Sequence, residues 1–331
     1  MRAAVCHAYG PPETIRVGDV PSPGIGAGQV RVRVGAAAVN FPDVLLIADE
    51  YQLTVPVPFV PGSEFAGLVT EASPGVTGIA VGDRVMGTAT TGAFAEEAVV
   101  AATSVTRVPG GVSDAHAAAF GVAHRTAYHV LRSVARVRPG ERLVVLGAGG
   151  GVGLAAIQLG ALLGASVTAV ASTDAKLEAA AARGAVTLIN HASSGAGGVG
   201  GGLRQALRAA FPDGVDAVVD PVGGDLAEPA LRALRWGGRF VTVGYASGTV
   251  PRIPLNLVLL KGCQILGFQF RDFAAHARDE MAGNEAALLE LLAAGRALPH
   301  VGATFPLAEA AAALRHVADG KAIGKVVLAI S

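Results

Sequence analysis

The sequence predicts an α/β protein built on a doubly wound, parallel β-sheet. The first observation is the apolar run 143–164, where a short strand passes through glycines into a helix, with no charged residue from Leu143 to Thr173. The second is the alternation of short apolar strands with helical segments after it, which is typical of a parallel sheet buried on both faces. The third is the pattern of the first 120 residues, where short predicted strands are separated by turn-forming residues.

The run 143–164 has the form of a dinucleotide-binding turn. It begins as a buried strand, Leu143–Leu146, and becomes a helix near Val152. The spacing Ala148-x-Gly150-x-x-Gly153 is the alanine-first form of the dinucleotide fingerprint, in which glycines let the backbone approach a pyrophosphate. The helix N-terminus adds unpaired N–H groups and a positive dipole end. A membrane span is the alternative, but glycines in the middle of the run argue against it. The predicted pyrophosphate-binding residues are Gly150, Gly151, Val152 and Gly153.

Further strands support a Rossmann sheet around this turn. They are expected at 166–171, 186–189, 215–220, 238–244 and 264–268, with a helix at 174–183. Such a sheet binds its ligand outside the carboxyl ends of its strands. We therefore expect Val222, Gly244 and Ala246, in the loops after the fourth and fifth strands, to contact nicotinamide or ribose. The glycine-rich stretch 193–202 is expected to be a flexible surface loop.

The end of the second strand predicts the cofactor. An acidic residue there would hold the ribose 2′-hydroxyl of NAD, whereas this chain has Ser172, Thr173 and, shortly after, Lys176. Hydroxyls and an ammonium suit a 2′-phosphate, so NADPH is the predicted cofactor. Ser172 could instead be a helix N-cap and Lys176 a solvated charge. The Asp174 carboxylate would repel a 2′-phosphate unless its side chain points away from it.

Composition fits an enzyme that acts on small molecules. The net charge of +0 suggests neither a nucleic acid nor an anionic membrane as partner. The N-terminus runs into a strand pattern, not a signal peptide, so a cytoplasmic location is expected. Two cysteines, Cys6 and Cys263, provide neither a disulfide framework nor a cysteine zinc site.

The first third suggests a separate, β-rich domain. Val30–Val34 alternates as a half-buried strand should, and turn clusters such as Pro61-Gly62 and Pro74-Gly75 recur. Helices at 113–119 and 125–134 are expected to lead into the nucleotide domain. A last strand at 325–330 is expected to return to the first domain. The predicted boundaries are 1–122, 123–268 and 269–331.

An ordered set of motifs resembles the medium-chain dehydrogenase/reductases. The motifs are Asn40-Phe-Pro-Asp43, Pro61-Gly-Ser-Glu-Phe-Ala-Gly67, Val81-Gly-Asp-Arg-Val85, Arg125-Thr-Ala-Tyr128 and the fingerprint at 148–153. The set spans essentially the whole chain and is most similar to the quinone oxidoreductase branch, which includes zeta-crystallin. The resemblance implies a GroES-like catalytic domain interrupted by the Rossmann domain, and a homodimer.

The chain departs from the zinc-dependent alcohol dehydrogenases that it also resembles. Asn40 stands near the position of their catalytic cysteine, and their Gly-His-Glu is here Gly62-Ser63-Glu64. Serine is a poor zinc ligand, and the soft thiolates are missing, so no metal is expected. The alternative of a stray metal on His116, His124 and His129 requires a closer spacing than these residues have.

Without a metal, the chemistry depends on the cofactor and on a few polar side chains. Asn40 is the candidate to orient nicotinamide or acceptor, with a turn residue as the alternative. The resemblance places Tyr51 near the substrate, where it would donate a hydrogen bond or be a packed aromatic. Asp43 is expected to be a structural cap. The resemblance also implies cofactor contacts for Thr126, His191, Phe268 and Lys325, where Lys325 could equally be a charge flanking a strand.

We therefore expect an NADPH-dependent, metal-independent oxidoreductase that reduces quinones or related activated alkenes. An enoyl-thioester reductase of the same superfamily is the alternative enzyme. A non-catalytic nucleotide-binding structural or regulatory protein is the alternative of another class.

Overall fold

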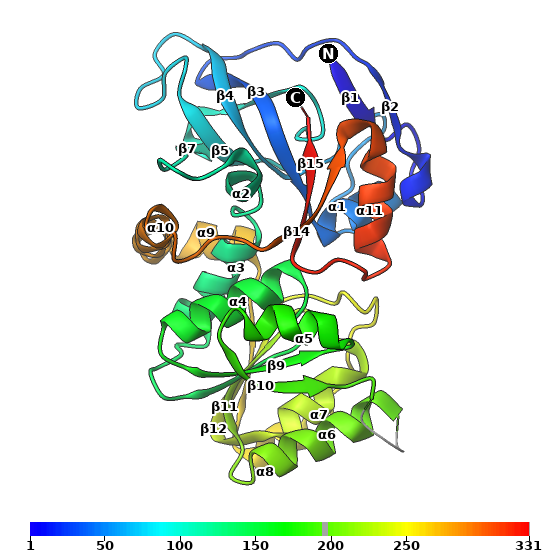
Figure 1. Cartoon of the computed structure of the whole chain (residues 1–331), viewed down its shortest axis with the longest axis vertical. Helices are drawn as coiled ribbons and strands as arrows, with labels where there is room; N and C mark the ends of the chain where they lie inside the picture. The colour runs from blue at the N-terminus through cyan, green and yellow to red at the C-terminus, as the bar shows by residue number, and fades with distance from the viewer. Residues whose placement is uncertain (194–197, 331) are drawn as a thin grey trace. The chain divides into compact units, whose positions relative to one another are not determined.

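The computed structural model describes residues 1–193 and 198–330, which form two compact units (Figure 1). The first unit contains Met1–Ala123 and Leu292–Ser331, and the second contains His124–Leu291. The chain thus leaves the first unit and returns to it. The chain returns to the first unit at Leu292, later than the predicted boundary at residue 268. Most of α10 (Arg278–Ala293) belongs to the second unit, where its Glu285 pairs with Arg125.

The first unit is a β-rich fold around a seven-stranded sheet in the order β14-β15-β3-β4-β5-β7, with β6 also pairing with β3. Its strands are β1 (Arg2–Val5), β2 (Arg16–Asp19), β3 (Gln29–Val39), β4 (Glu64–Ala72), β5 (Arg84–Thr88), β6 (Glu97–Ala101), β7 (Val105–Arg107), β14 (Val301–Pro306) and β15 (Lys325–Ala329). Its helices are α1 (Phe41–Ala48), α2 (Asp114–Ala118) and α11 (Ala310–Ala318). Val326 of β15 pairs antiparallel with Val39 of β3, which confirms the predicted return of the last strand.

The second unit is a Rossmann domain with a six-stranded parallel sheet in the order β10-β9-β8-β11-β12-β13. Its strands are β8 (Arg142–Val145), β9 (Ser166–Ala171), β10 (Ala185–Asn190), β11 (Val215–Asp220), β12 (Leu234–Thr242) and β13 (Gln264–Gly267). Its other helices are α3 (Ala123–His129), α4 (Gly151–Leu162), α5 (Asp174–Ala181), α6 (Gly198–Ala210), α7 (Ala227–Arg232), α8 (Asn256–Lys261) and α9 (Phe270–His276). The six predicted strands are all present; β9 and β11 have the predicted bounds, and the other four have shifted ends.

One local prediction was wrong and another was right only in part. The stretch 193–202 was expected to be a loop, but α6 begins at Gly198 and buries Leu203 and Leu207 against the sheet; residues 194–197 lie outside the described residues. The helix expected at 125–134 ends as a π-helical turn, Val130–Val134. The alternative of a membrane span also fails, because no helix in the described ranges is long and apolar enough to cross a bilayer.

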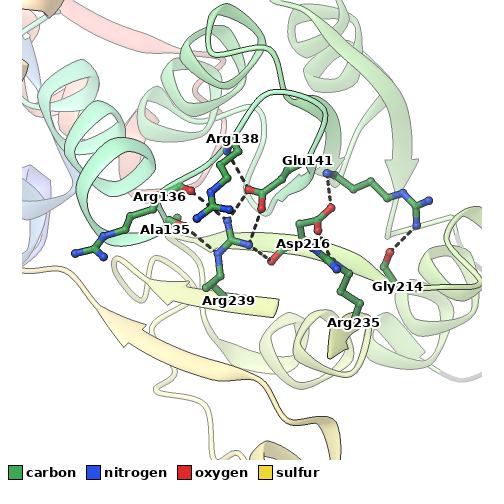
Figure 2. Close-up of polar contacts among 9 residues, drawn as sticks. Ala135, Arg136, Arg138, Glu141, Gly214, Asp216, Arg235 and Arg239 are labelled. Carbon is green, nitrogen blue, oxygen red and sulfur yellow. Dashed lines mark hydrogen bonds and ion pairs between the residues drawn. The ribbon is translucent and has the colours of Figure 1, made fainter. Parts of the chain in front are cut away.

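A polar cluster joins the amino-terminal ends of three neighbouring strands (Figure 2). Arg239 of β12 forms a bidentate pair with Glu141, which precedes β8, at 2.6 and 3.0 Å. The same guanidinium donates to the carbonyl oxygen of Ala135 at 2.9 Å. Asp216 of β11 accepts from the backbone N–H of Arg142 at 2.7 Å. Because ligands of such sheets bind at the carboxyl edge, this cluster stabilises the fold at the opposite edge.

Candidate functional site

The turn between β8 and α4 has the backbone geometry that a pyrophosphate needs. Gly147 has a φ of 59°, a left-handed conformation that favours glycine. A Cβ atom at Gly153 would overlap the carbonyl oxygen of Gly147, so that only glycine allows the helix to pack this closely on the strand. Gly150 is the N-cap of α4, and as a glycine it has no side chain that could cap the first turn of the helix. The first turn, Gly151 to Gly153, is therefore available to an anion.

Basic side chains lie beside this turn, at the carboxyl ends of β9 and β10. The Lys176 side chain crosses Gly149, where an added Cβ atom would overlap it. Burial lowers the pKa of Lys176. Burial and the nearby Lys176 ammonium lower the pKa of His191. The structure thus brings two of the predicted phosphate-binding residues together.

The N-cap of α5 is Thr173. The alternative interpretation of Ser172 as this N-cap is therefore wrong. The Thr173 side chain accepts from the backbone N–H of Lys176 at 3.4 Å. The Ser172 hydroxyl, on a partly exposed residue, therefore does not serve as the cap. Asp174 carries its carboxylate toward Asn190, whose Nδ2 donates to Oδ1 of Asp174 at 2.7 Å.

The loops after β11 and β12 follow the carboxyl ends of their strands, beside the glycine turn. The Val222 side chain approaches Gly147 so closely that a Cβ atom there would contact it at 2.5 Å. The two loops are joined by a hydrogen bond from the Ala246 N–H to the Pro221 carbonyl oxygen at 3.2 Å. Gly244 lies between β12 and Ala246, near the same carbonyl group. The residues Val222, Gly244 and Ala246 therefore lie together, at the carboxyl ends of the parallel strands.

A histidine that was considered above only as a metal ligand lies one helical turn after Thr126 and packs on Phe268. His129 follows Thr126 by one turn of α3 and is fully buried. Its ring stacks on Phe268 at a centroid distance of 6.4 Å and packs on Phe273 at 4.9 Å. Asn284 of α10 contacts Nδ1 of His129 at 3.2 Å. The end of β13 is thus fixed to α3, a contact that residue spacing gives no means of predicting.

A buried polar network occupies one end of the sheet in the first unit. Asn40 begins α1 in a capping box, where the Asn40 N–H donates to Oδ2 of Asp43 at 2.8 Å; this confirms Asp43 as a structural cap. Nδ2 of Asn40 donates to Oε1 of Glu64 at 2.9 Å. The Lys325 ammonium donates to Oδ1 of Asn40 at 2.5 Å and pairs with the Glu64 carboxylate. Lys325 and Glu64 are almost inaccessible, so that Lys325 is a buried ion-pair partner and not a charge flanking a strand.

Tyr51 lies close to this network. It follows α1 and is half-buried, and its pKa is raised by burial and by the nearby Asp43 carboxylate. Burial also raises the pKa of Asp43 to about 7, although the hydrogen bonds from the Asn40 backbone and Ser63 and the charge of Lys325 oppose this. A tyrosine with a raised pKa keeps its proton near neutral pH and can donate a hydrogen bond.

The three histidines considered as metal ligands are used elsewhere. Nδ1 of His116 contacts the Ser113 hydroxyl at 2.8 Å, and Nε2 of His124 contacts Gln158 at 3.1 Å. His129 lies in the aromatic cluster described above. Among the residues that the structure describes, no group of three or more His, Cys, Asp or Glu side chains could hold a metal ion.

Comparisons with known families match both units. Residues 26–110 match the alcohol dehydrogenase GroES-like domain, and residues 151–289 match the family described as zinc-binding dehydrogenase. The chain is 35% identical to quinone oxidoreductase-like protein 2 of Rattus norvegicus, over 99% of this chain and 92% of the rat protein. It is 37% identical to polyketide synthase GfsB of Streptomyces halstedii, over 92% of this chain but only 5% of that protein.

A solved structure agrees with these matches. The quinone oxidoreductase of Escherichia coli, determined in complex with NADPH, superposes with a TM-score of 0.90 and 26% identity over 100% of both chains. The similarity therefore extends to the order and geometry of both units.

Proposed function

The chain belongs to the quinone oxidoreductase branch of the medium-chain dehydrogenase/reductase family, and we propose that it reduces quinones or related activated alkenes without a metal. It is an oxidoreductase whose cofactor is NADPH. The single observation that carries the proposal for a metal-independent reaction is the buried Asn40–Glu64–Lys325 network. There the Lys325 ammonium balances the Glu64 carboxylate.

The second unit contains groups that fit each part of NADPH. We assign the pyrophosphate to the glycine turn, because the left-handed Gly147 and the close packing at Gly153 set the N-terminus of α4 at the carboxyl end of β8. The 2′-phosphate is assigned to the hydroxyls at the end of β9, to the Lys176 ammonium and to the His191 ring beside it. The assigned residues of this unit are Thr126, Gly150, Gly151, Val152, Gly153, Ser172, Thr173, Lys176, His191, Val222, Gly244, Ala246 and Phe268.

The first unit would supply the groups around the reacting atoms. Bound NADPH supplies the hydride. We assign Tyr51 as the donor to the oxygen on which negative charge develops, because it lies near Asp43 and the buried network and its hydroxyl is protonated at neutral pH. In Asn40, the second amide proton makes only long contacts, to the Ser63 hydroxyl at 3.3 Å and the Ala38 carbonyl oxygen at 3.4 Å. That proton can donate to nicotinamide or acceptor, while Lys325 would hold the amide in place.

Metal independence has a direct test. The purified protein should contain well under one zinc per chain by elemental analysis, and incubation with a chelator should leave its turnover intact. Stoichiometric zinc together with chelator-sensitive turnover would reject this part of the proposal.

The acceptor is tested by following NADPH oxidation with simple quinones, enones and enoyl-thioesters. Fastest turnover with quinones or simple enones supports the proposal. An enoyl-thioester reductase is the second candidate, because 92% of the chain matches a segment of a polyketide synthase at 37% identity. Preference for the thioester would favour this second candidate. Binding of NADPH without turnover on any acceptor would indicate a structural or regulatory protein.

We also propose that the protein is a homodimer formed through β13. This strand is at the edge of the parallel sheet, where unpaired backbone groups need a partner. Large apolar side chains that are exposed on and around it support the proposal: Trp236, Leu255, Leu259, Leu260 and Ile265. Pairing of this edge with its copy would close the assembly around a two-fold axis.

A further inference from the structure

One residue of the candidate 2′-phosphate site has the wrong charge for a phosphate. Asp174 is the first residue of α5, directly after Thr173 and two positions before Lys176. A carboxylate near this strand end favours the ribose hydroxyls of NADH and repels a 2′-phosphate. Because the cofactor is NADPH, the groups that contact this carboxylate bear on the choice of cofactor.

Asn190 makes such a contact. It is the last residue of β10 and lies in register with Ala171, the last residue of β9. Its Nδ2 donates to Oδ1 of Asp174 at 2.7 Å. Its Oδ1 accepts from the backbone N–H of Ala192 at 3.1 Å. The second contact determines which end of the amide faces Asp174, because a flipped amide would lose both hydrogen bonds.

We propose that Asn190 is a specificity-determining residue for NADPH, which holds the Asp174 carboxylate in a hydrogen bond and so limits its repulsion of the 2′-phosphate. The proposal rests on the assignment of that phosphate to Ser172 and Lys176. Two residues then contribute to the selectivity for NADPH. Lys176 attracts the phosphate, and Asn190 restrains the Asp174 carboxylate, which would repel it.

The restraint predicts a conditional effect. In Asn190→Ala, the freed Asp174 carboxylate can approach the phosphate, and the affinity for NADPH should fall about threefold to tenfold, as expected for like charges near a protein surface. The affinity for NADH should stay the same or rise. Asn190→Asp keeps an acceptor for the Ala192 N–H but places a second carboxylate beside Asp174, so the loss for NADPH should be larger and should shrink at high salt.

A double-mutant cycle tests the coupling between the two residues. The dissociation constants of NADPH and NADH are measured by cofactor fluorescence for the wild type, Asn190→Ala, Asp174→Asn and the double variant, which needs no knowledge of the acceptor. We expect Asn190→Ala to weaken NADPH binding in the wild type and to have no effect in the Asp174→Asn background. Asp174→Asn alone also shows that the site remains folded when the pair is broken.

Two results would overturn the inference. The first is an equal loss for NADPH and NADH, and the second is an unchanged effect of Asn190→Ala in the Asp174→Asn background. Either would mean that Asn190 only supports the local backbone at Ala192. Lys176→Ala separates this outcome from failure of the phosphate assignment. If that variant weakens NADPH about tenfold and leaves NADH unchanged, the assignment stands; if both cofactors weaken equally, the assignment itself fails.

Discussion

Tyr51 has the properties of a hydrogen-bond donor to a reacting oxygen. Its hydroxyl retains the proton at neutral pH, as that of an ordinary tyrosine does, and burial and the Asp43 carboxylate raise its pKa further. A hydrogen bond to a developing negative charge strengthens as the transition state forms. We therefore predict that Tyr51→Phe lowers kcat about tenfold or more while it changes KM little. Steady-state kinetics with several quinones measure the two constants, and the NADPH dissociation constant serves as the control.

Full turnover of Tyr51→Phe on every acceptor would contradict this assignment. Tyr51 would then be a packed aromatic residue, and the proton would come from water. Tyr9, whose exposed hydroxyl donates to the Val55 carbonyl oxygen at 2.8 Å, offers a matched Tyr→Phe control in the same unit.

Asp43 makes the stability of the fold depend on pH. Its folded pKa of about 7 lies above the ordinary value of 3.8 because the carboxyl group is buried. The folded state therefore binds a proton that the unfolded state releases between these values. The stabilisation is complete below about pH 4 and is lost as the pH rises through 7. Asp43→Asn, which keeps an acceptor for the Asn40 N–H, should flatten this part of the profile.

The measurement is the free energy of unfolding in urea at pH 4, 5.5 and 7, for the wild type and for Asp43→Asn. We expect the difference between the two proteins to change steadily across this range. A constant difference at all three values would mean that Asp43 does not titrate in the folded protein within that interval.

At the scale of elements, strands were easier to predict than caps and contacts. The strands β9 and β11 coincide with their predicted ranges, because apolar runs between turn residues are local signals. The N-cap of α5 was ambiguous, because Ser172 and Thr173 are both good capping residues and only the backbone decides between them. The helix α6 was missed because glycines at 198 and 200–202 lower helix propensity, and tertiary burial of Leu203 and Leu207 outweighs that cost.

The polar cluster at the amino ends of the strands gives a prediction about stability. Arg239 and Glu141 are both largely buried, and Arg239 also donates to the carbonyl oxygens of Ala135 and Asp216. Arg239→Met would leave the Glu141 carboxylate without its cation. We expect a loss of about 3 kcal/mol in the free energy of unfolding, measured by urea denaturation. NADPH affinity should not change, because the cluster lies at the edge of the sheet opposite the cofactor site.

The matched control is Arg208→Met, since Arg208 is exposed on α6. It should change the free energy of unfolding by less than about 0.5 kcal/mol. Similar small effects for both variants would show that the cluster contributes little to the stability of the fold.

At the scale of the whole molecule, the domain order followed from the sequence, but the site's network did not. The fingerprint turn and the returning strand identify an interrupted first domain, and both are local patterns. The contacts of Lys325 with Asn40 and Glu64 join residues from three distant segments. The resemblance suggested a cofactor contact for Lys325; burial in an ion pair instead suggests a positioning role, which no residue pattern reveals.

The proposed dimer gives the last prediction. The other edge strand, β10, also exposes two apolar side chains, Val186 and Leu188. On and around β13, however, there are five exposed apolar side chains. We therefore expect a Leu259→Glu/Leu260→Glu variant to be monomeric by light scattering at micromolar concentration, because buried carboxylates would oppose the apolar contact. Val186→Glu on β10 is the matched control and should leave the mass of the dimer unchanged.

Fluorescence provides an independent measurement of the same interface. Trp236 is the only tryptophan of the chain, and it is 81% exposed within one subunit. If β13 and α8 form the interface, this side chain is desolvated in the dimer, and its emission should shift to the red in the Leu259→Glu/Leu260→Glu variant. A wild-type protein that is monomeric and has the red emission of a solvated indole would exclude the dimer. A dimer that is broken by Val186→Glu instead would assign pairing to β10, at the opposite edge of the sheet.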